Sequence, residues 1–268
     1  MERFNVFEIE MACHIAGQGQ PIVLVHGFPL DHEMWHHQIQ YLSDHYQVIA
    51  PDLRGFGASQ RGTAEMTMRQ FACDLAELLQ QVVGSDQVCF CGLSMGGYIA
   101  WEFYRAFQKR VSHLILCDTR AAADDEATAR ARRMTARSVL KYGMSELAQS
   151  MPDRLASLVW QQSHPESLQQ LRDSIRRASP QSVADGLLGM SVRQDATQLL
   201  TTIDCPTLLI VGEHDAISTP HEMNAIATAI GNSRLVSVAD AGHLAPIENP
   251  QVVNGSICEF LDDERVSA

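Results

Sequence analysis

The sequence lacks a long apolar run, a basic N-terminal leader and any excess of positive charge. No stretch approaches the roughly 18 consecutive apolar residues that a membrane-spanning helix requires. The first residues, MERFNVFEIEMACHIAG, show no basic region followed by an apolar one, so we expect no secretory signal. Because 32 acidic residues stand against 20 Lys and Arg, the net charge is -12. This acidity argues against nucleic acid and anionic membrane surfaces as partners.

The cysteines lack the arrangement of a disulfide framework or a zinc site. They number seven, which is odd, and no C-x-x-C pair occurs among them. Cys89, Cys91 and Cys117 lie inside apolar runs, where a thiol behaves as a small hydrophobic group. Reduced, buried thiols are typical of a cytoplasmic protein, and we expect that location.

Apolar runs and helical patterns alternate along most of the 268 residues, a length that suits one large domain. Thr67 and Gln70 form a capping-box pattern for a helix that Gly84 would end, and Thr219-Pro220 would open another helix. The expected strands are an antiparallel pair at 3–9 and 11–15 and buried strands at 21–26, 46–50, 88–91, 111–117, 206–211 and 234–238. The pattern predicts an α/β fold whose mostly parallel sheet is covered by helices on both faces.

The alternation stops between residues 120 and 200, where only helical patterns occur. We therefore expect an α/β core formed by 1–119 and 201–268, with 120–200 as a helical insertion. Residues 121–200 hold 10 of the 20 basic residues and 9 of the 32 acidic ones, so the insertion is nearly neutral and the core is acidic. Arg130, Arg133 and Arg137 share one helical face that could attract an anionic substrate, although a solvated surface is the simpler interpretation.

A serine lies on a glycine-flanked turn between an apolar run and a helical pattern. The stretch is VCFCGLSMGG, residues 88–97. Gly92 and Gly96 lie two residues on either side of Ser94, where side chains would collide in so tight a turn. Such a turn holds the serine in strained backbone geometry, with its hydroxyl above the sheet and near the free amides of a helix N-terminus. Ser94 is therefore a candidate catalytic nucleophile.

A serine nucleophile needs a base within hydrogen-bond reach, and histidine suits that role because its pKa lies near neutral pH. His243 stands in the loop DAGHLAPIENP, between the last predicted strand and a helix that Asn249-Pro250 would open. Functional groups are often presented by loops of this kind. His113 lies within a predicted strand, where a structural role is expected. We predict His243 as the base.

An acid should orient the imidazole and stabilise its cation. Asp215, in VGEHDAISTP, directly follows the predicted strand 206–211, and the order Ser94, Asp215, His243 is that of a known hydrolase arrangement. Asp118 also follows a predicted strand and is the main alternative. Asp240 is close to His243 in sequence, but this nearness does not supply the required geometry. We predict Asp215 as the acid.

Attack on a carbonyl also requires N–H donors for the developing oxyanion, each of which lowers the barrier by about 3–4 kcal/mol. The amide of Met95, directly after the serine, is one candidate. The other should come from the loop after strand 21–26, where Gly27 permits unusual backbone angles and Phe28 can offer its amide. Pro29 has no N–H and cannot donate. We predict an oxyanion hole formed by the Phe28 and Met95 amides.

Five segments together resemble the α/β-hydrolase superfamily, of the serine esterase and 3-oxoadipate enol-lactonase type. They are HGFP at 26–29, DLRGFGAS at 52–59, GLSMGG at 92–97, GEHD at 212–215 and AGH at 241–243. The resemblance covers everything except the insertion. It implies an α/β-hydrolase fold with an eight-stranded, mostly parallel sheet, a helical cap over the active site, and a structural role for DLRGFGAS. The related haloalkane dehalogenases and epoxide hydrolases place a carboxylate nucleophile at the turn, so the serine argues against both.

The expected function is that of a cofactor-independent serine hydrolase acting on a small carboxylic ester or lactone through an acyl-enzyme. Carbon–carbon hydrolysis and peracid formation could use the same three residues. Two hypotheses come from other classes of protein. One is a hydrolase-like ligand receptor without significant turnover; the other is a zinc site at His32-Glu-Met-Trp-His36, which satisfies H-E-x-x-H but has no evident third ligand. We expect no metal.

Overall fold

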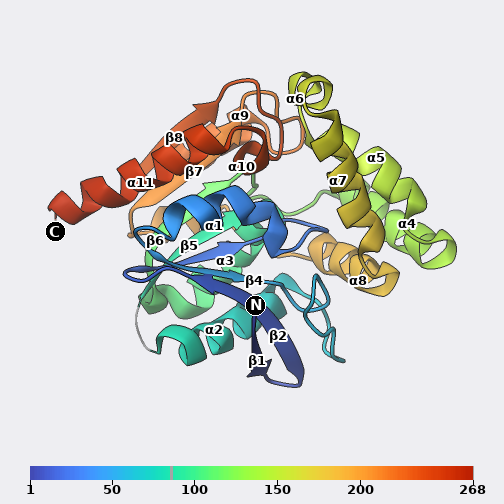
Figure 1. Ribbon diagram of the computed structural model, residues 1–268, viewed down its shortest axis with the longest axis horizontal. Helices are drawn as coiled ribbons and strands as arrows, with labels where there is room; N and C mark the ends of the chain where they lie inside the picture. Colours follow the sequence, from blue (N-terminus) through green and yellow to red (C-terminus); the bar gives the residue numbers. More distant parts are fainter. Residues whose placement is uncertain (85–86, 268) are drawn as a thin grey trace.

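The protein is built on one eight-stranded sheet, seen in a computed structural model that describes residues 1–84 and 87–267 (Figure 1). Residues 85, 86 and 268, which belong to the predicted core, lie outside the described residues. The strand order is β1-β2-β4-β3-β5-β6-β7-β8. The strands are β1 Glu2–Val6, β2 Ile9–Ala16, β3 Pro21–Val25, β4 Gln47–Pro51, β5 Val88–Leu93, β6 Val111–Cys117, β7 Thr207–Gly212 and β8 Ser233–Val238.

Strand direction confirms the predicted mostly parallel sheet. Among the strand pairs described, β1–β2 and β2–β4 are antiparallel, as predicted for the first hairpin, and the neighbours from β4 to β8 are all parallel. Parallel strands need crossover connections, and here helices supply most of them. Their carboxyl ends lie at one edge of the sheet, where the loops that follow β3, β5, β6, β7 and β8 gather.

Helices cover the sheet on both faces, with α2 and α3 on one side and α1 and α11 on the other (Figure 1). The core helices are α1 His36–Leu42, α2 Met68–Val83, α3 Met95–Phe107, α9 Pro220–Ala229, α10 Ala245–Glu248 and α11 Pro250–Ser267, with short 3-10 turns η1 His32–Trp35, η2 Gln108–Arg110 and η3 Leu200–Thr202. No helix in the described part of the chain is both long and apolar enough to cross a membrane.

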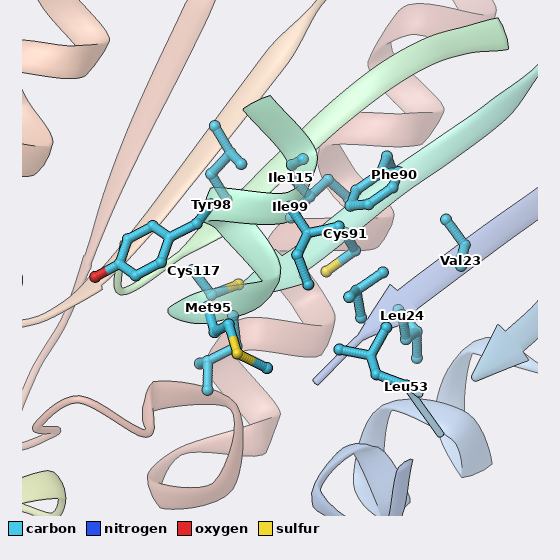
Figure 2. Close-up of a cluster of buried hydrophobic side chains, with 14 of the residues drawn as sticks. Val23, Leu24, Leu53, Phe90, Cys91, Met95, Tyr98, Ile99, Ile115 and Cys117 are labelled. Atoms are coloured by element: carbon cyan, nitrogen blue, oxygen red, sulfur yellow. The ribbon is translucent and has the colours of Figure 1, made fainter. Parts of the chain in front are cut away.

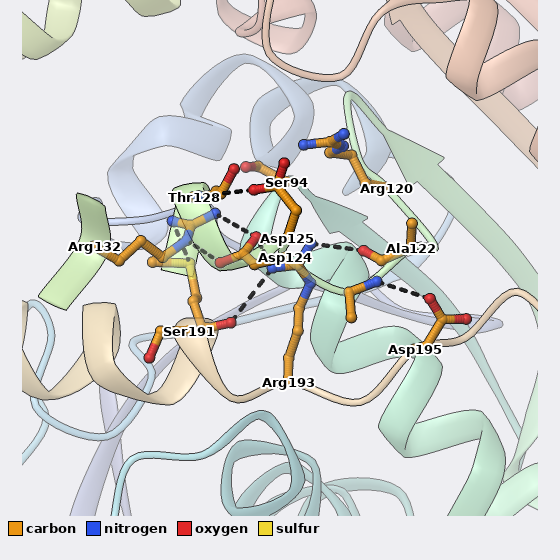
Figure 3. A network of polar contacts seen from close by, with 12 residues as sticks. Ser94, Arg120, Ala122, Asp124, Asp125, Thr128, Arg132, Ser191, Arg193 and Asp195 are labelled. Carbon is orange, nitrogen blue, oxygen red and sulfur yellow. Dashed lines mark hydrogen bonds and ion pairs between the residues drawn. The ribbon is translucent and has the colours of Figure 1, made fainter. Parts of the chain in front are cut away.

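Part of the hydrophobic core lies between β5 and α3. Every residue of β5 is buried, which explains why this strand has a continuous apolar sequence. Figure 2 shows Phe90 and Cys91 of β5 in one apolar cluster with Ile99 of α3 and Cys117 of β6. The segment that carries Ser94 is thus anchored on both sides by buried apolar surface.

The ends of α2 show how local chemistry sets an element's length. The hydroxyl of Thr67 accepts a hydrogen bond from the Gln70 amide at 3.1 Å, and Gly84, with φ of 64°, ends the helix. The Gln70 side chain donates to Asp74 at 2.9 Å instead of returning to the cap residue, so the predicted capping box is only half realised. At α9 the box of Thr219 and Glu222 is complete.

Five helices, and no strand among the described residues, connect β6 to β7. They are α4 Glu126–Tyr142, α5 Ser145–Leu155, α6 Leu158–Ser163, α7 Pro165–Arg177 and α8 Pro180–Ser191. They pack mainly on one another, α4 with α8 and α5 with α7, and extend beyond one end of the sheet (Figure 1). Arg130 and Arg133 pair with Glu126 at the surface, and Arg137 is exposed, so their shared face is a solvated one.

The loop DLRGFGAS contains a guanidinium that is fully buried. Arg54 binds Asp74 of α2 with two hydrogen bonds, Nε to Oδ2 at 2.7 Å and Nη2 to Oδ1 at 2.8 Å, and both side chains are 0% exposed. Arg54 also pairs with Glu8 in the turn between β1 and β2. These contacts tie the loop to a helix and to the first hairpin, and charges this deeply buried must be paired.

Arg54→Met is expected to lower the free energy of unfolding by about 3–5 kcal/mol, because it leaves the Asp74 carboxylate buried without its cation. The double variant Arg54→Met/Asp74→Leu removes both charges and should recover much of that loss. Urea unfolding of the wild type and both variants measures the difference. If the double variant is no more stable than the single one, the unpaired Asp74 charge does not explain the loss of stability in Arg54→Met.

Candidate active site

Ser94 occupies a sharp turn between β5 and α3. Its backbone is strained, with φ of 52° and ψ of −108°. The neighbouring backbone leaves no room for side chains: a Cβ on Gly96 would lie 2.3 Å from the carbonyl oxygen of Val25, and one on Gly92 would lie 2.5 Å from the Gly96 carbonyl. The turn is held by the Ser94 amide, which donates to the carbonyl of Cys117 at 2.9 Å. The serine is half-buried at the carboxyl edge of the sheet.

The structure brings the three predicted catalytic side chains into one line of hydrogen bonds. Nε2 of His243 lies 2.8 Å from Oγ of Ser94, and Nδ1 of His243 lies 2.8 Å from Oδ2 of Asp215. His243 and Asp215 are almost completely buried. A buried carboxylate at Nδ1 favours the tautomer that leaves Nε2 free to accept the serine proton.

The Asp215 carboxylate is itself fixed by its own loop. Oδ1 accepts hydrogen bonds from the amides of Ile217 at 2.7 Å and Ser218 at 3.0 Å, which leaves Oδ2 for His243. Ser218, which sequence reasoning missed, also places its hydroxyl 3.5 Å from Nδ1 of His243 and donates to the backbone carbonyl of Asp118 at 3.0 Å. This loop therefore presents one carboxylate oxygen to the imidazole in a defined direction.

Asp118, the alternative acid, lies nearby but makes different contacts. Its Oδ1 accepts from the Gly212 amide at 2.8 Å and its Oδ2 from the Ala245 amide at 3.1 Å. No hydrogen bond in the described chain joins it to His243. Burial raises the pKa of Asp118 well above its usual range, and the negative charge of Asp215 adds to this effect. Asp118 thus joins the end of β7 to the start of α10.

The other residues weighed against these lie away from Ser94. Asp240 is largely exposed, and its nearest charged partner is His214 at 3.9 Å. His113 packs edge-on against Phe260, with ring centroids 5.7 Å apart, as expected for a structural residue in a strand. Thr119 is a further residue that sequence reasoning missed: its hydroxyl donates to the Ser94 carbonyl at 2.8 Å and so supports the turn.

Two backbone amides beside Ser94 make no hydrogen bond within the described residues: those of Phe28 and Met95. Met95 is the first residue of α3, where an amide has no partner in its own helix. The loop of Phe28 passes close to the serine, because a Cβ on Gly27 would lie 3.6 Å from Cβ of Ser94 and 2.7 Å from the Leu93 side chain. These amides are available to an oxygen bound at Ser94.

The H-E-x-x-H segment does not gather its histidines around one point. His32 belongs to η1, whereas His36 opens α1 and packs edge-on against His37. In the part of the chain that is described, the one His, Cys, Asp or Glu group compact enough for a metal ion is Asp31, His32 and Asp52, with donor atoms within 4.8 Å of one another.

Each member of that group already has a local partner. Asp31 caps η1 by accepting from the Glu33 amide at 3.0 Å, and Asp52 accepts from Nδ1 of His32 at 2.7 Å. Although burial opposes it, the hydrogen bond to Asp52 raises the pKa of His32. An imidazole and a carboxylate bound to each other in this way form an ion pair without a metal.

Two grooves open near the junction of the helical segment and the core, and Ser94 lines neither. The larger, of about 1040 Å³, runs between α7 and the η1–α1 segment and is bordered by Ile247 and Glu248 of α10. The smaller, of about 600 Å³, lies between the 52–61 loop and the start of α8. The larger groove therefore reaches the segment that directly follows His243.

Asp118→Asn should change stability in a pH-dependent way. The raised pKa means that the folded protein keeps a proton that the unfolded chain releases near pH ~3.9. This contribution to stability is complete below the unfolded pKa and is lost as the pH rises toward the folded pKa. Asn cannot ionise, so its cost in unfolding free energy relative to wild type should be greatest at or below about pH 4 and should fall as the pH rises toward the folded pKa. Urea unfolding across that range measures this cost, and a constant cost would contradict the raised pKa.

Comparison with known proteins places this geometry in a family. Residues 20–250 match the family described as alpha/beta hydrolase fold. A thermophilic esterase from Thermogutta terrifontis, solved with malate bound, is 42% identical, with a TM-score of 0.95 over 98% of this chain and 99% of its own. The enol-lactonase from Burkholderia xenovorans LB400 is 27% identical, with a TM-score of 0.90 over 97% of this chain and 100% of its own.

Sequence comparison gives the same result. The 3-oxoadipate enol-lactonase 2 of Acinetobacter baylyi is 29% identical over 224 residues, which cover 84% of this chain and 82% of that protein. The family match spans strands β3 to β8, the loops at the carboxyl edge of the sheet and the helices between β6 and β7. The resemblance drawn from five short segments is thereby confirmed over most of the sequence. The chain belongs to the alpha/beta hydrolase fold family.

Proposed function

We propose that the protein is a serine hydrolase that cleaves small carboxylic esters or lactones through an acyl-enzyme intermediate. The observation that carries this proposal is the line of hydrogen bonds from Asp215 through His243 to Ser94, each 2.8 Å long. A serine hydroxyl becomes an effective nucleophile when a base accepts its proton during attack. The short contact to an imidazole that is held by a buried carboxylate meets this requirement.

In the proposed mechanism His243 transfers protons at Nε2. It accepts the Ser94 proton as Oγ attacks the carbonyl carbon, and then gives that proton to the leaving alcohol oxygen. In the second half it takes a proton from water, whose oxygen attacks the acyl carbon. It then returns that proton to Oγ of Ser94 as the bond from the acyl carbon to Oγ breaks and the acid leaves. Asp215 holds the imidazole and stabilises its cation in both halves.

The amides of Phe28 and Met95 are the proposed donors to the oxyanion. Both are free of partners within the described chain, and the Met95 amide also lies at the positive end of the α3 dipole. Fixed donors of this kind act mainly where negative charge develops, which is on the carbonyl oxygen in the transition state.

The proposed substrate class rests on the relatives and on the chemistry they share. An esterase and an enol-lactonase both align over nearly the whole chain, and a lactone is a cyclic ester that one acyl-enzyme mechanism can open. Malate was bound to the first of these, which favours substrates of similarly small size. We assign residues 120–200, which contain α4 to α8, as the cap, and 1–119 with 201–268 as the catalytic core.

Ser94→Ala should reduce turnover of p-nitrophenyl acetate or butyrate by ~10⁴-fold or more, because it removes the atom that forms the acyl-enzyme. Circular dichroism should show an unchanged fold, and a fluorophosphonate probe should label wild type but not the variant. Undiminished hydrolysis by the variant would overturn the proposal.

A panel of short esters, aryl esters and lactones then defines the preference. Faster turnover of a carbon–carbon substrate or of peracid formation would move the assignment to those chemistries. Labelling by the probe without turnover of any compound would indicate a ligand receptor.

Asp215→Asn should lower kcat by ~10⁴-fold, because an amide in place of the carboxylate favours the wrong imidazole tautomer. Asp118→Asn should lower it far less, since Asp118 contacts backbone amides and not the imidazole. Steady-state kinetics of the two purified variants measures the difference. The reverse order would transfer the role of acid to Asp118.

A further inference from the structure

The segment that carries His243 is held by a carboxylate outside the three proposed catalytic residues. Oε2 of Glu248 accepts a hydrogen bond from the Gly242 amide at 2.9 Å, and Oε1 accepts one from the Leu244 amide at 3.1 Å. The two donors are the immediate neighbours of His243. One side chain therefore fixes the backbone on both sides of the imidazole.

The same carboxylate reaches the cap. Oε2 of Glu248 also accepts from the amide of Ser157, between α5 and α6, at 2.8 Å. The His243 amide itself donates to the carbonyl of Leu155, the last residue of α5, at 2.7 Å. The Ser157 hydroxyl donates to the carbonyl of Asp240 at 2.6 Å. The segment 155–157 of the cap and the segment 240–244 of the core are thus joined by backbone hydrogen bonds and by Glu248.

The approach of these two segments is close enough to require glycine. A Cβ on Gly242 would lie 2.7 Å from the amide nitrogen of Ser157 and 2.8 Å from the carbonyl oxygen of Leu155. Both contacts are with backbone atoms, which a rotamer change cannot move. A shift of the cap segment at 155–157 must therefore be accompanied by a shift of the His243 segment or by the loss of these bonds.

Glu248 is well placed to carry this connection. It is the last residue of α10, a helix of four residues, and its own amide donates to the Leu244 carbonyl at 2.9 Å. Three N–H donors to one carboxylate are charge-assisted bonds, which are stronger than those between neutral groups.

We propose that Glu248 is a positioning residue that fixes His243 for catalysis and joins its segment to cap residues 155–157. The proposal rests on the proposed function, in which His243 is the base. Within the described residues no hydrogen bond joins the Glu248 side chain to Ser94 or Asp215, so it acts through the backbone on either side of the histidine.

Glu248→Gln tests this with little change in side-chain volume. The amide has one acceptor oxygen instead of two and no charge, and its NH₂ group faces N–H donors. We expect kcat to fall ~10- to 100-fold, the loss typical of a displacement near 1 Å in a catalytic group, while KM changes little.

Glu213→Gln is the matched control. Glu213 is an exposed carboxylate that accepts one long bond, 3.4 Å, from the Asp240 amide of the same loop, but does not bind the residues beside His243. Its kcat should equal that of wild type. A purely structural role for Glu248 would lower the melting temperature yet leave kcat per phosphonate-titrated site unchanged, and this result would overturn the proposal.

A measurement that needs no turnover separates this proposal from the proposed function. The Nδ1 proton of His243, bound to Asp215, can be followed by ¹H–¹⁵N NMR as the imidazole titrates. In Glu248→Gln the signal should broaden through exchange. Glu248→Asp retains the charge on a shorter side chain and is used if the first variant does not fold; there the signal should also broaden.

The outcomes are distinct. A wild type that neither hydrolyses esters nor reacts with the phosphonate would refute the proposed function, while the NMR titration would still test the positioning of His243. A His243 signal and titration identical to wild type in the Glu248 variants would refute the positioning role even if the protein is an active esterase.

Discussion

Backbone segments at the carboxyl edge of the sheet approach one another more closely than any side chain would allow, and the candidate active site depends on that approach. A Cβ on Gly96 would lie 2.3 Å from the Val25 carbonyl oxygen, and one on Gly212 would lie 1.9 Å from that of Gly242. The first contact seats the strained Ser94 turn against β3, and the second holds the loops of Asp215 and His243 together. The two 2.8 Å bonds of the imidazole are possible because the backbones that carry the three side chains are fixed at this spacing.

Much of this arrangement could be predicted from sequence because it has local causes. Strands buried on both faces appear as apolar runs, and β5 and β7 are fully buried along their length. The Ser94 turn can be recognised in the sequence, because its geometry requires a glycine two residues before the serine and another two residues after it. Asp215 and His243 each lie in the loop that follows a strand. Because the carboxyl ends of parallel strands share one edge of the sheet, the sequence predicts that these two residues lie close together. The capping box predicted at Thr67 is only half realised, because the Gln70 side chain binds Asp74, one turn further along α2, instead of the cap residue.

The remaining contacts could not be predicted, because they join residues that are far apart in sequence and carry no motif. Thr119 supports the Ser94 carbonyl across 25 residues, Ser218 reaches Asp118 across 100, and Glu248 receives the Ser157 amide across 91. Thr119, Ser218 and Glu248 are common polar residues, and each lies near a segment whose motif is visible in the sequence. Only the folded chain shows that their donors and acceptors face the loops that carry Ser94, Asp215 and His243, because segments far apart in sequence pack against one another there.

The two strand-end aspartates show why residue type alone does not define a catalytic role. Asp118 and Asp215 follow adjacent strands, and both are buried. Asp215 binds two amides through one oxygen and keeps the other for the imidazole, whereas both oxygens of Asp118 are taken by the amides of Gly212 and Ala245. Burial raises the pKa of Asp118, no ion pair within the described residues offsets this effect, and the charge of Asp215 raises the pKa further, so the environment favours the neutral form. A neutral group makes a poor orienting acid for a histidine that becomes charged. The backbone around each carboxylate therefore decides that Asp215 suits the imidazole and that Asp118 holds the loops on which the imidazole stands.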